Sequence, residues 1–251
     1  HLVPAADVWR EQIHECAAEL ADVGRLAQEA DVRLTFHPFL EVVLNGLDED
    51  QTALAVDHTT AAATLLDAMG LGPESVIVLH VGGVYDDGIA SRERFMRRYE
   101  ALPAFVQRRL ALEADDRRYG HDDVRLIHER CGIPLVFDNL HHLVFTPSGI
   151  PTREALAYCL GTWPDGVRPK IHFSSPRTEM RPLEGTGRIK MPSWTEHADF
   201  ANPFEFIALM REAEKLPPFD VMLEARARDL AVLQLREDLR RFAPDVAARF
   251  C

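Results

Sequence analysis

The stretch PLVFDNLHH, Pro134 to His142, decides the fold prediction. Apolar residues run into Asp138, and His141 and His142 follow almost at once. This pattern predicts a short buried strand that carries an acid and imidazoles at its C-terminal end. Carboxylate and imidazole groups together are typical metal ligands. A strand-end aspartate is also a common N-cap of the next helix, so this stretch alone leaves both interpretations open.

The same unit, a short apolar strand followed by a helix, repeats along the chain. Strands are predicted at Val32–Pro38, Ser75–Gly83, a stretch ending at Glu113, Pro134–Asp138, the segment PKIHFSS and Phe219–Ala225. Helices are predicted at Asp7–Ala30, Asp50–Met69, Ala90–Arg109, Gly120–Cys131, Pro151–Leu160 and Asp229–Arg241. Such alternation is typical of parallel βα units covered on both faces. No linker or low-complexity stretch divides the chain, so we expect one α/β domain over residues 1–251.

One long segment, Ser174 to Trp194, has no clear periodicity. It holds Arg177, Arg181, Arg188 and Lys190 among prolines and glycines. Loops of this length are often functional. A loop that contacts substrate and a plain solvated loop are equally compatible with this composition.

Composition restricts the class of protein. With 251 residues and 47% hydrophobic content, the chain can bury a substantial core. It has no membrane-length apolar run and no leader-like start, which predicts a soluble, cytoplasmic protein without membrane contact. The four scattered cysteines are expected to be reduced thiols. The net charge of −12 argues against a polyanionic partner such as DNA, although acids gathered around metal ions are locally neutralised.

Each predicted strand ends in a side chain that can bind a metal ion. In chain order these are His37, His80, Glu113, Asp138 with His141, His172 and Glu224, and His197 follows in the loop segment TEHADF. In a parallel barrel the carboxyl ends of the strands converge, so these groups are expected to form one site. Their number predicts two or three divalent ions, and their mixture favours zinc or manganese. Such a cluster is suited to phosphodiester hydrolysis. The ammonium of Lys170 would be repelled there unless it is neutral, modified or pointed away.

Seven segments in fixed order carry a resemblance to a known family. They are FHPFLEVVLN, VLHVGGVYDD, RLALEADDRRY, GIPLVFDNLHH, TWPDGVRPKIHFSSPR, EHADF and FDVMLEARARDLA. The chain resembles the UV-damage endonucleases, which are metal-dependent barrels related to endonuclease IV and xylose isomerase. The resemblance implies a (β/α)8 TIM-barrel fold, with about six of its eight βα units evident here, and a manganese cluster that nicks damaged double-stranded DNA on the 5′ side of UV photoproducts.

The resemblance also implies roles for individual residues. The metal ligands would be His37, His80, Glu113, Asp138, His141, His172, His197 and Glu224. Lys170 would be carboxylated, which turns the cation into a bridging anion, and would act in catalysis with Glu224 and His197. Substrate contacts would come from Tyr85, Arg177, Arg181, Arg226 and Arg228.

The chain departs from the family at several positions. Leu40 and Glu41 stand where the family has a glutamine and an aromatic residue that wedge into the duplex, and a carboxylate facing a DNA backbone is repulsive. Ala114 replaces an asparagine beside Glu113. Two family strands precede the point where this sequence opens, so we expect a fragment or divergent relative whose barrel is completed by a partner copy or by local rearrangement. A sugar isomerase or small phosphoester hydrolase on the same barrel, and a degenerate relative without catalysis, remain alternatives.

Overall fold

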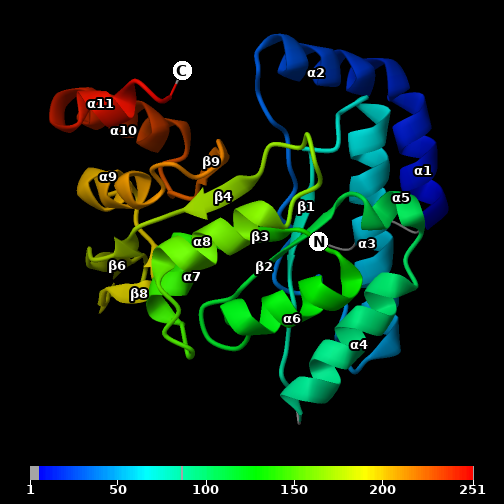
Figure 1. The fold of residues 1–251 in the computed structure, drawn as a ribbon. Coiled ribbons are helices and arrows are strands. Elements are labelled where there is room, and N and C mark those ends of the chain that lie inside the picture. Colours follow the sequence, from blue (N-terminus) through cyan, green and yellow to red (C-terminus); the bar gives the residue numbers. More distant parts are fainter. Residues whose placement is uncertain (1–5, 86, 251) are drawn as a thin grey trace. The chain divides into compact units, whose positions relative to one another are not determined.

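A computed structural model describes residues 6–85 and 87–250 and divides them into two compact units (Figure 1). Unit 1 is made of the described residues up to Ala114, with Asp122–Val136 and Thr162–Arg168. Unit 2 is made of Asp115–His121, Phe137–Gly161 and the described residues from Pro169 onward. The sequence segment His1 to Pro4, on which the prediction of a short N-terminus rests, lies outside the described residues.

Unit 1 packs helices around the first strands. Its elements are α1 (Ala6–Glu15), α2 (Ala17–Glu29), α3 (Glu49–Ala68), β1 (Ile77–His80), α4 (Gly88–Glu100), α5 (Ala104–Gln107), β2 (Leu110–Glu113), α6 (His121–Cys131) and the first residues of β3 (Leu135–Asp138). Strand β1 pairs in parallel with β2, and β2 with the start of β3. Phe36 adds a single parallel bridge to Ile77 on the other side of β1.

The core of unit 1 explains why these strands hold together. Val76, Val78, Ala111 and Val136 are buried against Trp163. The indole Nε1 of Trp163 donates to the Leu135 carbonyl at 2.8 Å, so the ring is buried without leaving its one donor unpaired. The strands are apolar on both faces, as the sequence pattern predicts for parallel strands.

Unit 2 continues the alternation. Its elements are the end of β3, α7 (Asn139–Val144), α8 (Thr152–Gly161), β4 (Lys170–Phe173), β5 (Pro176–Arg177), β6 (Arg181–Leu183), β7 (Arg188–Lys190), β8 (Ser193–His197), α9 (Pro203–Glu212), β9 (Asp220–Leu223), α10 (Asp229–Phe242) and α11 (Pro244–Ala247). The end of β3 pairs in parallel with β4, and β4 with β9. Phe173 of β4 packs edge-on against Phe206 of α9, with ring centroids 4.9 Å apart.

Several predicted elements differ from the structure. The helix predicted at Asp7–Ala30 is two helices, because the backbone at Cys16 leaves helical geometry (φ −96°, ψ 17°). The helix predicted at Ala90–Arg109 ends at Glu100, since Pro103 lacks an N–H and begins α5 instead. The strand predicted at Val32–Pro38 contributes only the bridge at Phe36.

The segment Ser174–Trp194 is also more regular than its sequence indicates. It holds two antiparallel ladders, β5 with β8 and β6 with β7. Helix α9 was not predicted, although Asn202 caps its first turn by accepting from the Phe204 N–H at 3.0 Å and Pro203 occupies its first position.

Among the described cysteines, Cys16, Cys131 and Cys159 are free thiols. Burial raises the pKa of the Cys159 thiol to about 12. Cys251 lies outside the described residues. Of the helices in the described part of the chain, none has the length and apolar character to cross a membrane.

The close approach of α2 to the end of α3 gives the first prediction. A Cβ built on Gly24 would overlap the Met69 carbonyl oxygen, whereas one on Gly161, the last residue of α8, meets nothing within 4 Å. Replacing a helical glycine by alanine normally stabilises a protein by roughly 1 kcal/mol. We expect Gly24→Ala instead to lower the free energy of unfolding by about 1–3 kcal/mol, because the helices must separate.

Gly161→Ala is the matched control and should be neutral or slightly stabilising. Urea unfolding followed by circular dichroism measures both variants. A Gly24→Ala protein as stable as the control would contradict the close helix packing.

Candidate metal centre

Unit 1 brings three of the expected ligands together. His37, His80 and Glu113 each offer one ligand atom, and these atoms lie within 4.8 Å of one another. The His37 Nε2 is 3.1 Å from the Glu113 Oε2, and the His80 Nε2 is 3.9 Å from the same oxygen. The carboxylate is fully buried, while His37 is partly exposed. Two imidazoles around one buried carboxylate form a set that suits a transition-metal ion.

The register of β1 and β2 produces this arrangement. His80 ends β1 and Glu113 ends β2, and the two are direct partners in the parallel ladder. Partner residues on adjacent strands project their side chains to the same face, so the two groups must meet. His37 follows Phe36, whose backbone is held on β1 by two hydrogen bonds, from Phe36 N to Val76 O and from Val78 N to Phe36 O.

Two arginines from α4, which sequence reasoning missed, hold the loops that follow His37 and His80. Arg98 donates to the carbonyls of Leu44 and Gly46, and Arg94 donates to the carbonyl of Asn45 at 2.7 Å. The buried Asn45 side chain then donates to the Gly83 carbonyl at 2.7 Å. The i, i+4 spacing of the two arginines was visible in the sequence. Their carbonyl partners, some fifty residues away, were not.

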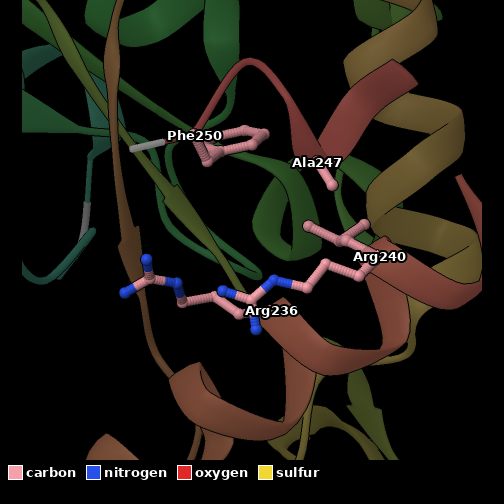
Figure 2. Close-up of a pocket in the computed structure, with 5 residues that line it drawn as sticks. Arg236, Arg240, Ala247 and Phe250 are labelled. Atoms are coloured by element: carbon pink, nitrogen blue, oxygen red, sulfur yellow. The ribbon is translucent and has the colours of Figure 1, made fainter. Parts of the chain in front are cut away.

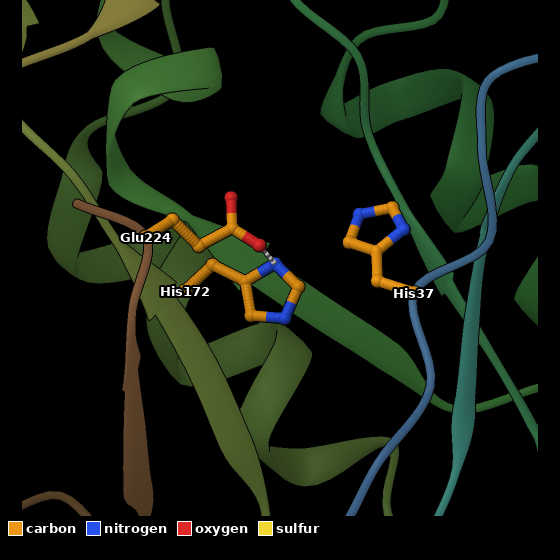
Figure 3. A group of neighbouring side chains, drawn as sticks. All are labelled: His37, His172 and Glu224. Carbon is orange, nitrogen blue, oxygen red and sulfur yellow. Dashed lines mark ion pairs between the residues drawn. The ribbon is translucent and has the colours of Figure 1, made fainter. Parts of the chain in front are cut away.

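Unit 2 brings together a second set of ligands. One ligand atom from each of Asp138, His172 and Glu224 lies within 4.8 Å of the others. Figure 3 shows one pair of this set, with the His172 Nδ1 3.2 Å from the Glu224 Oε1. His197 lies at the edge of this set, its Nε2 3.8 Å from the Glu224 Oε2, and the His141 Nδ1 is 3.9 Å from the Asp138 Oδ1. His172 is almost fully buried.

Strand register again explains the set. Asp138 and His172 are direct partners at the ends of β3 and β4, and the Glu224 N–H donates to the Phe173 carbonyl, which continues the pairing of β4 and β9 by one residue. Asp138 also caps α7, because its Oδ1 accepts from the His141 N–H at 2.7 Å. The two interpretations of Asp138 left open by the sequence are therefore compatible: the capping contact fixes the carboxylate beside His172.

Lys170 begins β4 and is only 2% exposed. It stands two residues before His172, and side chains at i and i+2 of a strand share a face. Lys170 is therefore on the same face of β4 as a residue of the unit 2 ligand set.

Two neighbours of this set have shifted pKa values. Burial lowers the pKa of His142, against an opposing backbone hydrogen bond at Ile150. The His142 ring packs on Phe137 with centroids 5.3 Å apart, which fits a structural role. Burial raises the pKa of Asp116, but the hydrogen bond and charge of Arg117, together with His141, hold it below its ordinary value.

The arginines expected to contact substrate differ in burial and in their ion-pair partners. Arg177 is fully buried and donates to the Glu196 carboxylate and to the carbonyls of Glu179 and Met191. This argues against phosphate contact by Arg177. Arg181 pairs with Glu179 and Asp199. Arg226 and Arg228 are exposed, although Arg226 lies 3.9 Å from Asp199.

Tyr85 lies in the loop after β1, in unit 1. Its backbone is left-handed (φ 54°), its side chain is 43% exposed, and the Arg94 guanidinium lies 5.6 Å from the ring centroid. The loop after His37 exposes an apolar tip, because Leu40 and Phe39 have the largest exposed fractions among the large hydrophobic residues described, 76% and 69%.

Two hollows in unit 2 are lined by residues outside the ligand sets. One of about 30 Å³ is lined by Arg236, Leu239, Arg240, Ala247 and Phe250, which is room for one or two waters (Figure 2). A larger one of about 530 Å³ is lined by Arg211, Glu214, Lys215, Asp245, Val246 and Arg249. Neither of these two hollows contains a residue of the ligand sets.

Comparison with known proteins settles the family. Residues 1–247 match the family described as UV-endonuclease UvdE. The chain belongs to the UV-endonuclease family. A UV DNA damage endonuclease of Bacillus velezensis is 32% identical over 244 residues, which cover 95% of this chain and 72% of that protein. Membership of this family supports a DNA-repair endonuclease, an enzyme that acts on DNA.

Solved structures establish the fold class. The crystal structure of SacUVDE is 30% identical with a TM-score of 0.76, and the match covers 90% of this chain and 72% of that one. Endonuclease IV from Thermus thermophilus has a TM-score of 0.60 at 13% identity, covering 90% of this chain and 81% of that one, and shows the fold alone. The UV-endonuclease described here is therefore of the TIM-barrel type, as predicted. The two ligand sets of this family member support divalent-metal binding.

The unit 1 set gives the second prediction. Glu113→Gln keeps the shape of the side chain and removes its charge, so affinity for Mn²⁺ should fall by roughly tenfold or more. Glu129→Gln, an exposed residue of α6 paired with Arg125, is the control and should bind as the unchanged protein does. Isothermal titration with manganese chloride measures both. Unaltered binding by Glu113→Gln would remove His37, His80 and Glu113 as a metal site.

Proposed function

We propose that this UV-endonuclease hydrolyses the phosphodiester on the 5′ side of UV photoproducts in double-stranded DNA, and that it needs two or three divalent ions, manganese above all. The observation that carries this proposal is the pairing of strand-end ligands: His80 beside Glu113 in one ladder, and Asp138 beside His172 in another. A second carboxylate or imidazole lies next to each pair. Bound divalent ions would supply an activated water and stabilise charge on the phosphate oxygens.

The chain's own residues divide the remaining tasks. His37, His80 and Glu113 would hold metal in unit 1, and Asp138, His141, His172, His197 and Glu224 in unit 2. Glu224 lies between two imidazoles, those of His172 and His197, so its carboxylate has one oxygen near each. The His197 side chain is 29% exposed, whereas that of His172 is enclosed. We therefore assign the catalytic role among these imidazoles to His197, as the metal ligand that faces solvent and substrate, rather than to His172.

Phosphate contacts are assigned to exposed cations. Arg226 and Arg228 lie two and four residues after Glu224 and are exposed, so their guanidinium groups are available for bidentate binding of phosphate oxygens. Arg181 is a weaker candidate because two carboxylates already neutralise it. Tyr85 would contact the duplex from unit 1. Arg177 is left out because it is buried.

The direct test uses supercoiled plasmid, irradiated with UV or left undamaged. The proposal expects nicking of the irradiated plasmid with Mn²⁺, none with chelator, and cut ends that map to the 5′ side of the photoproducts. Glu224→Gln should reduce the rate by at least about a hundredfold, because a charged group in the reacting site is lost. Equal inactivity on both plasmids with metal bound would contradict the proposal.

Lys170 is proposed to be carboxylated. A buried ammonium on the same strand face as His172 would repel bound cations, whereas a carbamate supplies a further anionic ligand. Protein exchanged into ¹³C-labelled bicarbonate should show a carbamate carbon resonance by NMR. Lys170→Arg, which keeps the charge and cannot be carboxylated in this way, should lack that resonance. The same spectrum from both proteins would exclude the modification.

A further inference from the structure

A hairpin arm in unit 2, residues 178–194, exposes a group of large apolar side chains. The arm consists of β6 and β7, the turn between them, and the chain that leads into β8 (Figure 1). Met180, Ile189, Met191 and Trp194 are each between 60% and 66% exposed. Side chains of this size are usually covered, and several together mark an interaction surface.

The register of the hairpin determines which residues lie on each of its two faces. Arg181 pairs with Lys190, Pro182 with Ile189, and Leu183 with Arg188. Because directly opposite residues share a face and successive residues alternate, Pro182 and Ile189 lie on one face, and Leu183 lies on the other with the basic residues. By the same alternation Met180 and Met191, each one residue outside its strand, belong to the apolar face.

The arm has a defined conformation, held by its turn and by hydrogen bonds at its base. Its turn, between Leu183 and Arg188, has left-handed glycines at 185 and 187, and the Thr186 hydroxyl donates to the Leu183 carbonyl at 2.8 Å. At the other end, the buried Arg177 guanidinium donates to the carbonyls of Glu179 and Met191, one from each side of the hairpin. Arg177 therefore anchors the base of the arm, which accounts for its burial.

The arm carries three cations, of which Arg181 and Lys190 are paired with carboxylates and Arg188 is exposed on β7. Lys190 pairs with Glu196 at 2.7 Å, Arg177 pairs with the same carboxylate, and Arg181 pairs with Glu179 and Asp199. Paired cations release few counterions on binding a polyanion. With two of its three cations paired, the arm offers a contact surface that is mainly apolar.

We propose that the arm contacts DNA through this apolar face and through the exposed Trp194 that follows it in β8, with Trp194 and the methionines packed against bases or sugars exposed beside the lesion. The proposal rests on the proposed function. The arm is continuous with the candidate site, because β8 runs from Ser193 through Trp194 to His197, whose Nε2 faces Glu224. Apolar side chains such as methionine and isoleucine insert beside bases in proteins that deform DNA, and aromatic rings stack on bases.

Trp194 provides a direct readout. The chain has three tryptophans, and Trp9 and Trp163 are 5% and 7% exposed while Trp194 is 66% exposed. Quenching by acrylamide therefore reports mainly on Trp194. The protein is titrated with dye-labelled, UV-irradiated duplex, first with chelator and then with Mn²⁺, and the anisotropy of the dye reports formation of the complex. In the complex, quenching of Trp194 by acrylamide should fall severalfold. Trp194→Phe is the matched control and should lose the quenching change while its anisotropy change remains.

A second measurement separates apolar contact from phosphate contact. The double variant Ile189→Ser with Met191→Ser should bind irradiated duplex about tenfold more weakly, with an unchanged slope of log affinity against log salt. Arg226→Gln should instead reduce that slope by about one. Circular dichroism spectra identical to those of the unchanged protein establish that the variants are folded.

Three outcomes would overturn the inference. Full acrylamide access to Trp194 in a complex confirmed by anisotropy, with the double variant binding normally, would remove the arm from the interface and leave the proposed function standing. If Trp194 is protected from acrylamide in the absence of DNA, and this protection increases with protein concentration, the face contacts a second copy of the chain. No anisotropy change with or without Mn²⁺ would remove DNA binding, and with it both the proposed function and the role of the arm.

Discussion

The constraint on which the candidate centre depends is the register of short parallel strands. One pairing places His80 beside Glu113, and another places Asp138 beside His172. A shift by one residue would turn each side chain to the opposite face. The strands are only four residues long, so the register is fixed by what covers them: the Trp163 core in unit 1 and the phenylalanine packing of Phe173 on Phe206 in unit 2.

Burying these polar groups has a free-energy cost that the rest of the structure must offset. Glu113 is fully buried, and His172 and Lys170 nearly so. Ionised groups taken out of water cost several kcal/mol each unless they are paired or bind ions. Glu113 and His172 each belong to a set of possible metal ligands, which supports metal binding as a means of offsetting this cost. Such sets bring carboxylates and imidazoles together where apolar contacts would be more stable.

The strand-end ligands could be predicted from sequence because each one directly follows the apolar run that marks its strand. An apolar run that ends in His or an acid is local information, and parallel strands bring their ends together by topology. The Arg94 and Arg98 contacts, the burial of Arg177 and the β6–β7 hairpin could not be predicted in this way. Each depends on carbonyls or strands distant in the sequence, or on turn geometry at Gly185 and Gly187 that composition alone describes only as a loop.

Anomalous X-ray scattering from crystals grown with Mn²⁺ tests the central claim most directly. The account predicts anomalous peaks within bonding distance of Glu113 and one of its imidazoles, and of Glu224 with His172 or His197. Crystals that hold Mn²⁺ elsewhere, with both carboxylates bound only to protein groups, would contradict the assignment of the strand ends as the metal centre.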